Sequence, residues 1–348
     1  MSDHGFIPAI QGLRGLAALA VVASHIYAMP YLAGLIPPGF PQWADLALAA
    51  GGRGVELFFI ISGYLIPASL VRHGALSKFF LDRALRIMPV FVTLHVVLFV
   101  IGPVIGYKFF AGIDPLSYLR IFLTNLFFIQ DFVGDPIAQQ NAWTLTYEWV
   151  FYIWFAMLFT AFARGRLALA VCLAAVALPL VWFFPRTIYF GLGMLMAWRP
   201  IRLVLPGAAG LSAGLALLVV MFGLCEYVSP YAGLPPAVLL FAMVLSGRNG
   251  FARLLETAAL QFVGKISYSL YLVHPFILFA CLAMARRLVA LGLGPWTVFA
   301  CFAVLGVAAS LIAAAASYEM IEVRMRQLIR RNVSAVRALP RLGRLPRS

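Results

Sequence analysis

Long apolar stretches separated by short polar segments make up most of this chain. A membrane-spanning helix needs about 20 mostly apolar residues, and ten stretches are candidates. They are residues 8–29, 52–71, 88–107, 143–163, 167–184, 187–199, 207–226, 234–247, 266–285 and 296–318. The sixth and eighth are short, which suits a tilted, kinked or re-entrant segment, and residues 115–129 are mixed enough to lie in the interface. The pattern predicts an all-α polytopic membrane helical bundle with about ten transmembrane helices.

The composition supports this prediction and excludes an ordinary soluble domain. Of the 348 residues, 64% are hydrophobic and 11% are charged, whereas soluble domains carry about 45–50% apolar and about 25% charged residues. The net charge is +14. No basic stripe with interleaved aromatic residues offers a nucleic-acid surface, so we assign the basic excess to cytoplasmic loops.

The distribution of Lys and Arg predicts the orientation. With the N-terminus inside and ten spans, 19 basic residues fall in inner segments and six in outer loops, as the positive-inside rule requires. We therefore expect both termini to be cytoplasmic and the protein to be multi-pass in the plasma (inner) membrane. We expect a membrane domain over residues 1–322 and a disordered basic tail over 323–348. The four cysteines show no metal spacing, and no metal site is expected.

Ionisable residues are costly in a bilayer, so each is a candidate for function. In the first stretch, Arg14 and His25 are eleven residues apart. At 100° and 1.5 Å per residue, they share a helix face and lie about 16 Å apart along the axis. The alternative is a snorkelling arginine and a packing histidine. His95 has no such polar company, and we assign it a structural role.

Two carboxylates enter apolar stretches from the predicted outer side. Glu56 lies in "GGRGVELFFIISGYLI", with Ser62 and Tyr64 deeper in the same stretch. Its alternative is a structural ion pair with Arg53. Glu148 lies in "NAWTLTYEWVFYI", where an aromatic belt explains the Trp and Tyr residues but not the carboxylate. The alternative for Glu148 is a solvated interfacial position.

Two further clusters follow helical spacing. Arg83 and Arg86 are three residues apart in "RALRIMPV" and share a helix face at the predicted cytoplasmic interface. Guanidinium groups there suit phosphate oxygens, although an ordinary basic loop is the alternative. Tyr268, Tyr271 and His274 also follow at intervals of three. For His274 the alternative is a structural hydrogen bond at the kink before a proline.

Five motifs occur in the order and spacing of a known family. "RGLAALAVVASH", "GVELFFIISGYLI", "RALRIMPV", "WTLTYEWVFY" and "ISYSLYLVHP" resemble those of the acyltransferase-3 family of integral membrane acyltransferases, over roughly residues 6–320. The resemblance implies transfer of an acyl group, usually acetyl, from cytoplasmic acyl-CoA to a hydroxyl of a glycan such as exopolysaccharide, lipopolysaccharide O-antigen or peptidoglycan. The short chain is most similar to exopolysaccharide O-acetyltransferases. Acyl-CoA is then the donor substrate, and no permanently bound cofactor is expected.

The polar residues suggest a mechanism for such a transfer. A sugar hydroxyl needs a base, and histidine titrates near the working pH. Our hypothesis makes His25 the general base, with Glu148 or Glu56 orienting its ring, while an acyl-enzyme on His25 or Ser62 remains an alternative. Arg83, Arg86 and Arg14 would meet the CoA phosphates. The remaining candidates for substrate binding are Tyr64, Tyr268, Tyr271 and His274, of which the last three would line the path or polarise the thioester carbonyl.

Two other classes of function stay open from the sequence. In a transporter the buried charges would form a substrate or proton path, although we see no related halves. In an envelope scaffold the basic tail would bind anionic lipid or a partner. The acceptor, the acyl chain and the oligomeric state, homo-oligomer included, are not determined by the sequence.

Overall fold

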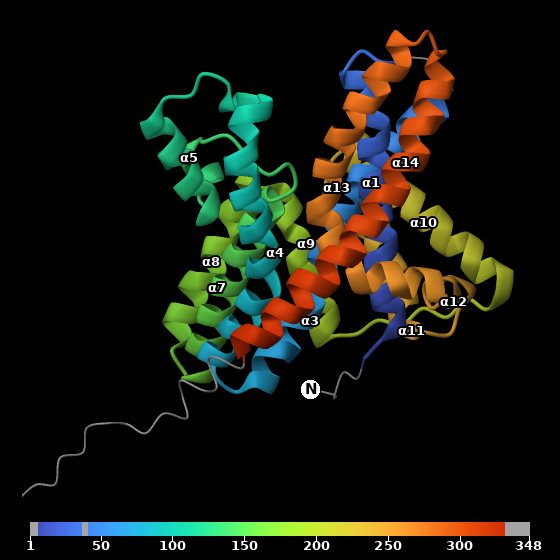
Figure 1. The fold of residues 1–348 in the computed structure, drawn as a ribbon. Helices are drawn as coiled ribbons and strands as arrows, with labels where there is room; N and C mark the ends of the chain where they lie inside the picture. The colour runs from blue at the N-terminus through green and yellow to red at the C-terminus, as the bar shows by residue number, and fades with distance from the viewer. Residues whose placement is uncertain (1–5, 37–40, 331–348) are drawn as a thin grey trace, which may run out of the picture.

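The structure is a computed structural model that describes residues 6–36 and 41–330, and this part of the chain is helical, without strands. Figure 1 shows the arrangement. The elements are α1 (Pro8–Leu32), α2 (Gln42–Ala50), η1 (Gly51–Arg53), α3 (Gly54–His73), α4 (Leu76–Ile105), η2 (Lys108–Phe110), α5 (Pro115–Leu126), α6 (Gln130–Val133), α7 (Trp143–Ala163), α8 (Leu167–Phe183), η3 (Pro185–Thr187), α9 (Ile188–Trp198), α10 (Gly207–Tyr227), α11 (Leu234–Ser246), α12 (Gly250–Leu255), α13 (Ala258–Ala290), α14 (Pro295–Ser317) and the π-helix η4 (Tyr318–Val323).

The expected all-α membrane architecture is confirmed at the level of its helices. Within the described residues, seven helical segments are long and apolar enough to cross a membrane. They contain α1, α3, α4, α7, α10, α13 and α14. The other three predicted stretches form the shorter helices α8, α9 and α11. The protein is therefore a multi-pass membrane protein.

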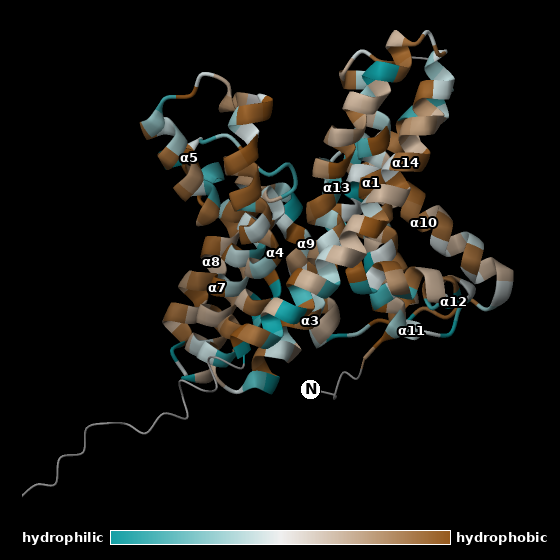
Figure 2. Ribbon diagram, viewed as in Figure 1, coloured by the Kyte–Doolittle hydropathy of each residue, from teal (hydrophilic) through white to brown (hydrophobic). Residues whose placement is uncertain are grey.

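The helices form two groups in Figure 1. The end of α14 and its continuation through η4, coloured red, cross from one group to the other. α13 packs against both α1 and α14, and α3 packs against α9. Large apolar side chains face outward; Val104 on α4 is 84% exposed and Trp182 on α8 is 77% exposed. Figure 2 shows the same apolar colour along the outer faces of these helices. A lipid environment explains this exposure, because water would make it unfavourable.

Close approach of α3 and α9 depends on two glycines. A Cβ on Gly193 would lie 2.1 Å from the backbone oxygen of Ile60, and one on Gly63 would lie 2.1 Å from that of Phe190. We expect Gly193→Ala to destabilise the protein by about 1–3 kcal/mol, because the backbone of α3 must move. Thermal unfolding of the detergent-solubilised protein measures this change. Gly191→Ala is the matched control, since a Cβ there meets nothing within 4 Å, and equal melting temperatures for the two variants would contradict the packing argument.

Two predicted boundaries differ from the structure. The stretch predicted at 266–285 is the central part of α13, which spans 33 residues. Residues 324–330, which the sequence places in the predicted tail, continue the helix after η4. Residues 331–348 lie outside the described part of the chain. We call residues 318–330 the C-terminal strap.

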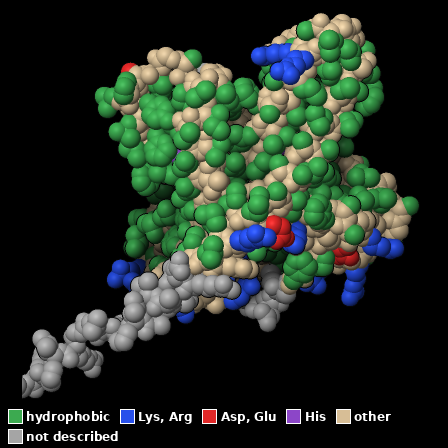
Figure 3. Space-filling view, viewed as in Figure 1, with side chains coloured by type: hydrophobic (Ala, Val, Ile, Leu, Met, Phe, Trp, Pro, Cys, Tyr) green, Lys and Arg blue, Asp and Glu red, His purple; other side chains and the backbone are tan. Residues whose placement is uncertain are grey.

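Basic side chains gather on one side of the molecule. Figure 3 shows Lys and Arg mainly along its lower edge, with one further group at the top. In Figure 1, α1 begins and the strap ends on this same lower side. Both described ends of the chain therefore lie on the side that carries most of the visible basic charge.

Candidate functional site

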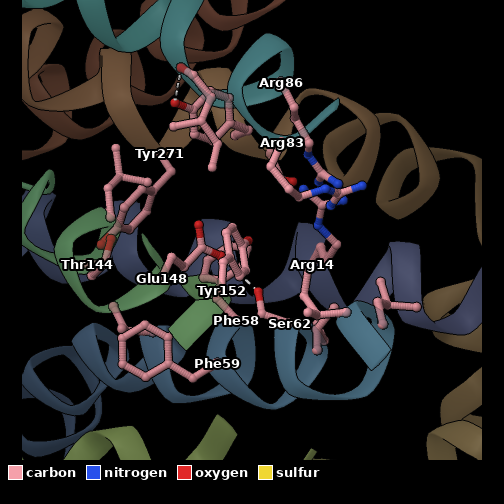
Figure 4. Close-up of a pocket in the computed structure, with 18 residues that line it drawn as sticks. Arg14, Phe58, Phe59, Ser62, Arg83, Arg86, Thr144, Glu148, Tyr152 and Tyr271 are labelled. Carbon is pink, nitrogen blue, oxygen red and sulfur yellow. Dashed lines mark hydrogen bonds between the residues drawn. The ribbon is translucent and has the colours of Figure 1, made fainter. Parts of the chain in front are cut away.

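A cavity of about 80 Å³ lies between five helices, α1, α3, α4, α7 and α13 (Figure 4). It brings together side chains that are as far apart in sequence as residues 14 and 271. Seven of the eleven residues predicted from the sequence line it, namely Arg14, Ser62, Arg83, Arg86, Glu148, Tyr268 and Tyr271. Convergence of residues that are expensive to bury is typical of a functional site.

One end of the cavity is strongly cationic. The side chains of Arg14, Arg83 and Arg86 meet there in Figure 4, the first from α1 and the others from α4. Arg83 and Arg86 reach it together because residues three apart share a helix face. The Arg83 Nε has no hydrogen-bond partner among the described residues. Three guanidinium groups in one place are stable only with compensating negative charge, and phosphate oxygens match their geometry.

Glu148 is the carboxylate that lines the cavity. The Ser62 hydroxyl donates a hydrogen bond to its Oε1 at 2.8 Å, from α3 to α7. Glu148 was one of the two carboxylates expected to orient His25, and the structure pairs it with Ser62 instead. Tyr152, which sequence reasoning missed, lines the cavity one turn further along α7; its four-residue spacing from Glu148 was the available signal.

Glu56 does not orient His25 either. Its side chain is fully buried and forms ion pairs with Arg53 at 3.3 Å and with Arg186 at 3.7 Å. Arg53 also pairs with Glu226 on α10. A buried carboxylate needs such partners, so the alternative weighed from the sequence, an ion pair with Arg53, is what the structure shows. The network ties α3 to η3 and α10, away from the cavity lining.

Tyr64 also lies away from the cavity. Two residues along a helix correspond to a rotation of 200°, so Tyr64 points to the opposite side of α3 from Ser62. Its ring meets Phe241 of α11 edge to face at a centroid distance of 5.4 Å. Tyr64, predicted to bind substrate, is therefore not among the residues that line this cavity.

His25 of α1 pairs with His274 of α13. His25 Nδ1 lies 2.8 Å from His274 Nε2, and the ring planes are 26° apart. His274 is fully buried, and its own Nδ1 lies 2.8 Å from the carbonyl oxygen of Leu270. His95, by contrast, lies among phenylalanine rings and bonds the Phe122 carbonyl, which fits a structural role.

These contacts determine where the protons of the neutral pair lie. A carbonyl oxygen only accepts, so His274 carries its proton on Nδ1 and its Nε2 is an acceptor. The Asn141 amide supports this assignment, because its Nδ2 donates to the Tyr271 carbonyl at 2.8 Å and lies 3.4 Å from the same His274 Nε2. His25 must then donate from Nδ1. Its Nε2 therefore carries a free lone pair, as a general base requires.

The histidine pair lies just beyond one end of the cavity. Neither ring lines it, but Tyr271 does, and the Tyr271 ring centroid is 6.4 Å from that of His274. Two residues missed from the sequence lie at this end: Asn141 just before α7, and the cavity residue Thr144 in the first turn of α7. Arginines and histidines thus occupy opposite ends, about 16 Å apart along α1 between Arg14 and His25.

Comparison with known families decides the class of this protein. A family model described as an acyltransferase domain matches residues 7–315. The chain belongs to the acyltransferase-3 family. It is a membrane O-acyltransferase, and the match includes every helix that lines the cavity. The whole strap, residues 318–330, lies beyond the matched residues.

Curated relatives support the same chemistry. The chain is 28% identical to the acyltransferase MdmB of Streptomyces mycarofaciens over 313 residues, 77% of this chain and 78% of MdmB. It is 33% identical to nodulation protein 10 of Rhizobium leguminosarum bv. viciae over 180 residues, 48% of each chain. It is 28% identical to the peptidoglycan O-acetyltransferase OatA of Listeria monocytogenes over 218 residues, 53% of this chain and 31% of OatA. No solved structure matches the acyltransferase.

Proposed function

We propose that this acyltransferase moves an acetyl group from cytoplasmic acetyl-CoA to a hydroxyl of a cell-surface or exported glycan. The observation that carries the proposal is the cavity, with three arginines at one end and the histidine pair beyond the other. The name of its relative OatA supports a glycan acceptor. Membership in an acyltransferase family weighs against the alternative of a transporter.

The arginine end suits the donor's nucleotide. Arg14, Arg83 and Arg86 offer charge-assisted hydrogen bonds to phosphate oxygens. We place the narrow pantetheine arm along the cavity between the helices, where apolar side chains such as Phe58 and Leu65 accompany the polar ones. This arrangement directs the thioester towards His25 and leaves the bulky nucleotide outside the bundle.

At the histidine end, the chemistry follows from the proton positions. The Nε2 of His25 takes the proton of the acceptor hydroxyl while the hydroxyl oxygen attacks the thioester carbonyl carbon. The carbon–sulfur bond then breaks, and the CoA thiolate receives the proton from His25. His274 stabilises the imidazolium of His25 by accepting from its Nδ1–H. The products are the acylated hydroxyl and free CoA.

The other lining residues take narrower roles. The Tyr268 hydroxyl donates to the Ile87 carbonyl at 2.7 Å, so its proton is engaged and the residue lines the path. Tyr271, at the end nearer the histidines, is our candidate to stabilise the oxyanion. The Ser62–Glu148 hydrogen bond suits a second route through an acyl-serine, since a carboxylate can accept the hydroxyl proton. Ping-pong kinetics would identify that route.

The membrane arrangement is part of the proposal. We assign ten spans, the seven long helical segments together with α8, α9 and α11, and we assign both termini to the cytoplasm. The excess of Lys and Arg in the segments assigned inside supports this orientation. Arg14, Arg83 and Arg86 then face cytoplasmic acyl-CoA, and the plasma (inner) membrane is the location that gives access to exported glycans.

The glycans of the producing cell test the acceptor class. We expect deletion of the gene to remove an O-acyl signal from the proton NMR spectra of purified envelope and secreted glycans. Restoring the gene should bring the signal back, because the proposed reaction of this protein forms that ester. Identical spectra with and without the gene would show that the acceptor is not a glycan, and lipids and small exported molecules would be tested next.

A further inference from the structure

Asp82 on α4 forms a charge cluster next to the arginine end of the cavity. Its carboxylate accepts hydrogen bonds from Arg83 at 2.9 Å, Arg326 at 2.7 Å and Arg330 at 2.6 Å. His73 Nε2 lies 3.9 Å from the same carboxylate. Three guanidinium groups therefore meet one carboxylate, which leaves two positive charges uncompensated when His73 is neutral. Arg83 belongs to both this cluster and the cavity lining.

The C-terminal strap brings Arg326 and Arg330 to this place. After α14 it passes through the π-helix η4, which packs against both α4 and α13. Glu322 in η4 accepts a hydrogen bond from Ser269 of α13 at 3.1 Å. Figure 1 shows the strap crossing from α14 to the lower end of α4. π-Helical turns occur frequently at functional sites, and this one sets the direction in which the two arginines reach α4.

We infer that Arg326 and Arg330 bind the ribose 3′-phosphate of the acyl-CoA donor, with Asp82 holding them in place beside Arg83. The inference rests on the proposed donor. Along CoA, the order from the thiol is pantetheine, pyrophosphate, then the phosphorylated ribose. If the thioester faces His25 and the pyrophosphate meets Arg14, Arg83 and Arg86, the 3′-phosphate lies further out, on the Asp82 side.

Charge and access at the cluster both fit a phosphate monoester. Such a group carries about −1.5 to −2 at neutral pH, opposite in sign to the net positive charge that Arg83, Arg326 and Arg330 keep after pairing with Asp82. The Arg326 and Arg330 side chains are 32% and 54% exposed, against 14% for Arg83. Both side chains are therefore partly open to an arriving ligand. Arginine also has donors left over after pairing with one carboxylate.

Equilibrium binding of CoA and of 3′-dephospho-CoA to the full-length protein in nanodiscs tests the inference without an acceptor. We expect wild type to bind CoA about tenfold more tightly than 3′-dephospho-CoA, the loss typical of one charge-assisted contact. The double variant Arg326→Ala/Arg330→Ala should bind both ligands equally, at the wild-type affinity for 3′-dephospho-CoA. Arg324→Ala is the matched control, because Arg324 is exposed on the same strap and makes no ion pair with another described residue.

The outcomes separate this inference from the proposed function. Equal wild-type affinity for the two ligands would overturn the 3′-phosphate assignment while leaving CoA as the donor. Failure of wild type to bind either ligand would overturn the proposed donor as well. A double variant that weakens both ligands by the same factor would show that the strap arginines only support the fold. If the double variant does not fold, Arg330→Ala alone, at the more exposed position, should still narrow the difference between the two ligands, and an unchanged difference would reject the inference.

Discussion

His25→Ala is expected to lower kcat for acyl transfer by about 10²–10⁴-fold, the usual contribution of a general base. The free lone pair on His25 Nε2 is the reason, because the contacts of His274 leave that nitrogen without a proton in the neutral pair. The affinity for CoA should not change, since the arginines that would hold the nucleotide lie at the other end of the cavity. Initial rates of acetyl transfer in proteoliposomes, with CoA affinity measured in parallel, check both parts.

A second histidine provides the control for this experiment. His95 is buried in α4 and bonds the Phe122 carbonyl through Nε2 at 3.1 Å. His95→Gln places an amide nitrogen near the same position and should keep both the hydrogen bond and the activity. Full activity of folded His25→Ala protein would assign the base to another residue, and Glu148 beside Ser62 would then be the first candidate.

The cavity could be predicted from the sequence to the extent that local spacing determines it. Arg14, Arg83 and Arg86 were singled out because charges are costly in apolar stretches, and Arg83 and Arg86 share a face through their three-residue spacing. Membership in a motif does not by itself predict that a residue lines the cavity. Tyr64 belongs to the same motif as Ser62, but a rotation of 200° around the helix turns it away from the cavity. The helix period of 100° per residue separates the directions of the two side chains, although both belong to the same motif.

Partners from distant helices could not be predicted. His25 and His274 are 249 residues apart, and nothing in either motif specifies that α1 and α13 pack side by side. The sequence predicts a carboxylate, Glu148 or Glu56, as the partner of His25, whereas in the structure these carboxylates pair with Ser62 and Arg53. Hydrophobic patterning determines which segments are helices, whereas the pairing of polar groups depends on how those helices pack.

Helix ends were predicted less well than helix centres for a related reason. Hydropathy marks the apolar part of a helix, but polar residues with good helix propensity extend it. α13 continues on both sides of its apolar part, and the strap continues α14. In the strap, Arg326 and Arg330 reach Asp82, so a segment that composition assigns to a solvated tail is tied to the bundle.

His274 variants test how the base is oriented, and we expect them to separate orientation from simple packing. His274→Ala removes the acceptor for His25 Nδ1–H, so the His25 ring can turn or shift its proton to Nε2. Misplacement of a catalytic group typically costs on the order of 10²-fold in rate. We therefore expect kcat to fall by that factor while the KM for acetyl-CoA stays near its wild-type value.

Two amide variants at this position distinguish orientation of the His25 ring from simple packing. In His274→Gln the side-chain oxygen can reach the site of Nε2 and accept from His25, whereas in His274→Asn the amide ends near the site of Nδ1 and cannot. Activity should therefore follow the order wild type, Gln, then Asn together with Ala. A purely structural role would make the rates follow the melting temperatures of the variants instead. If Gln and Asn lose the same activity at equal melting temperatures, His274 does not orient His25, and the His25 tautomer must be held by another contact.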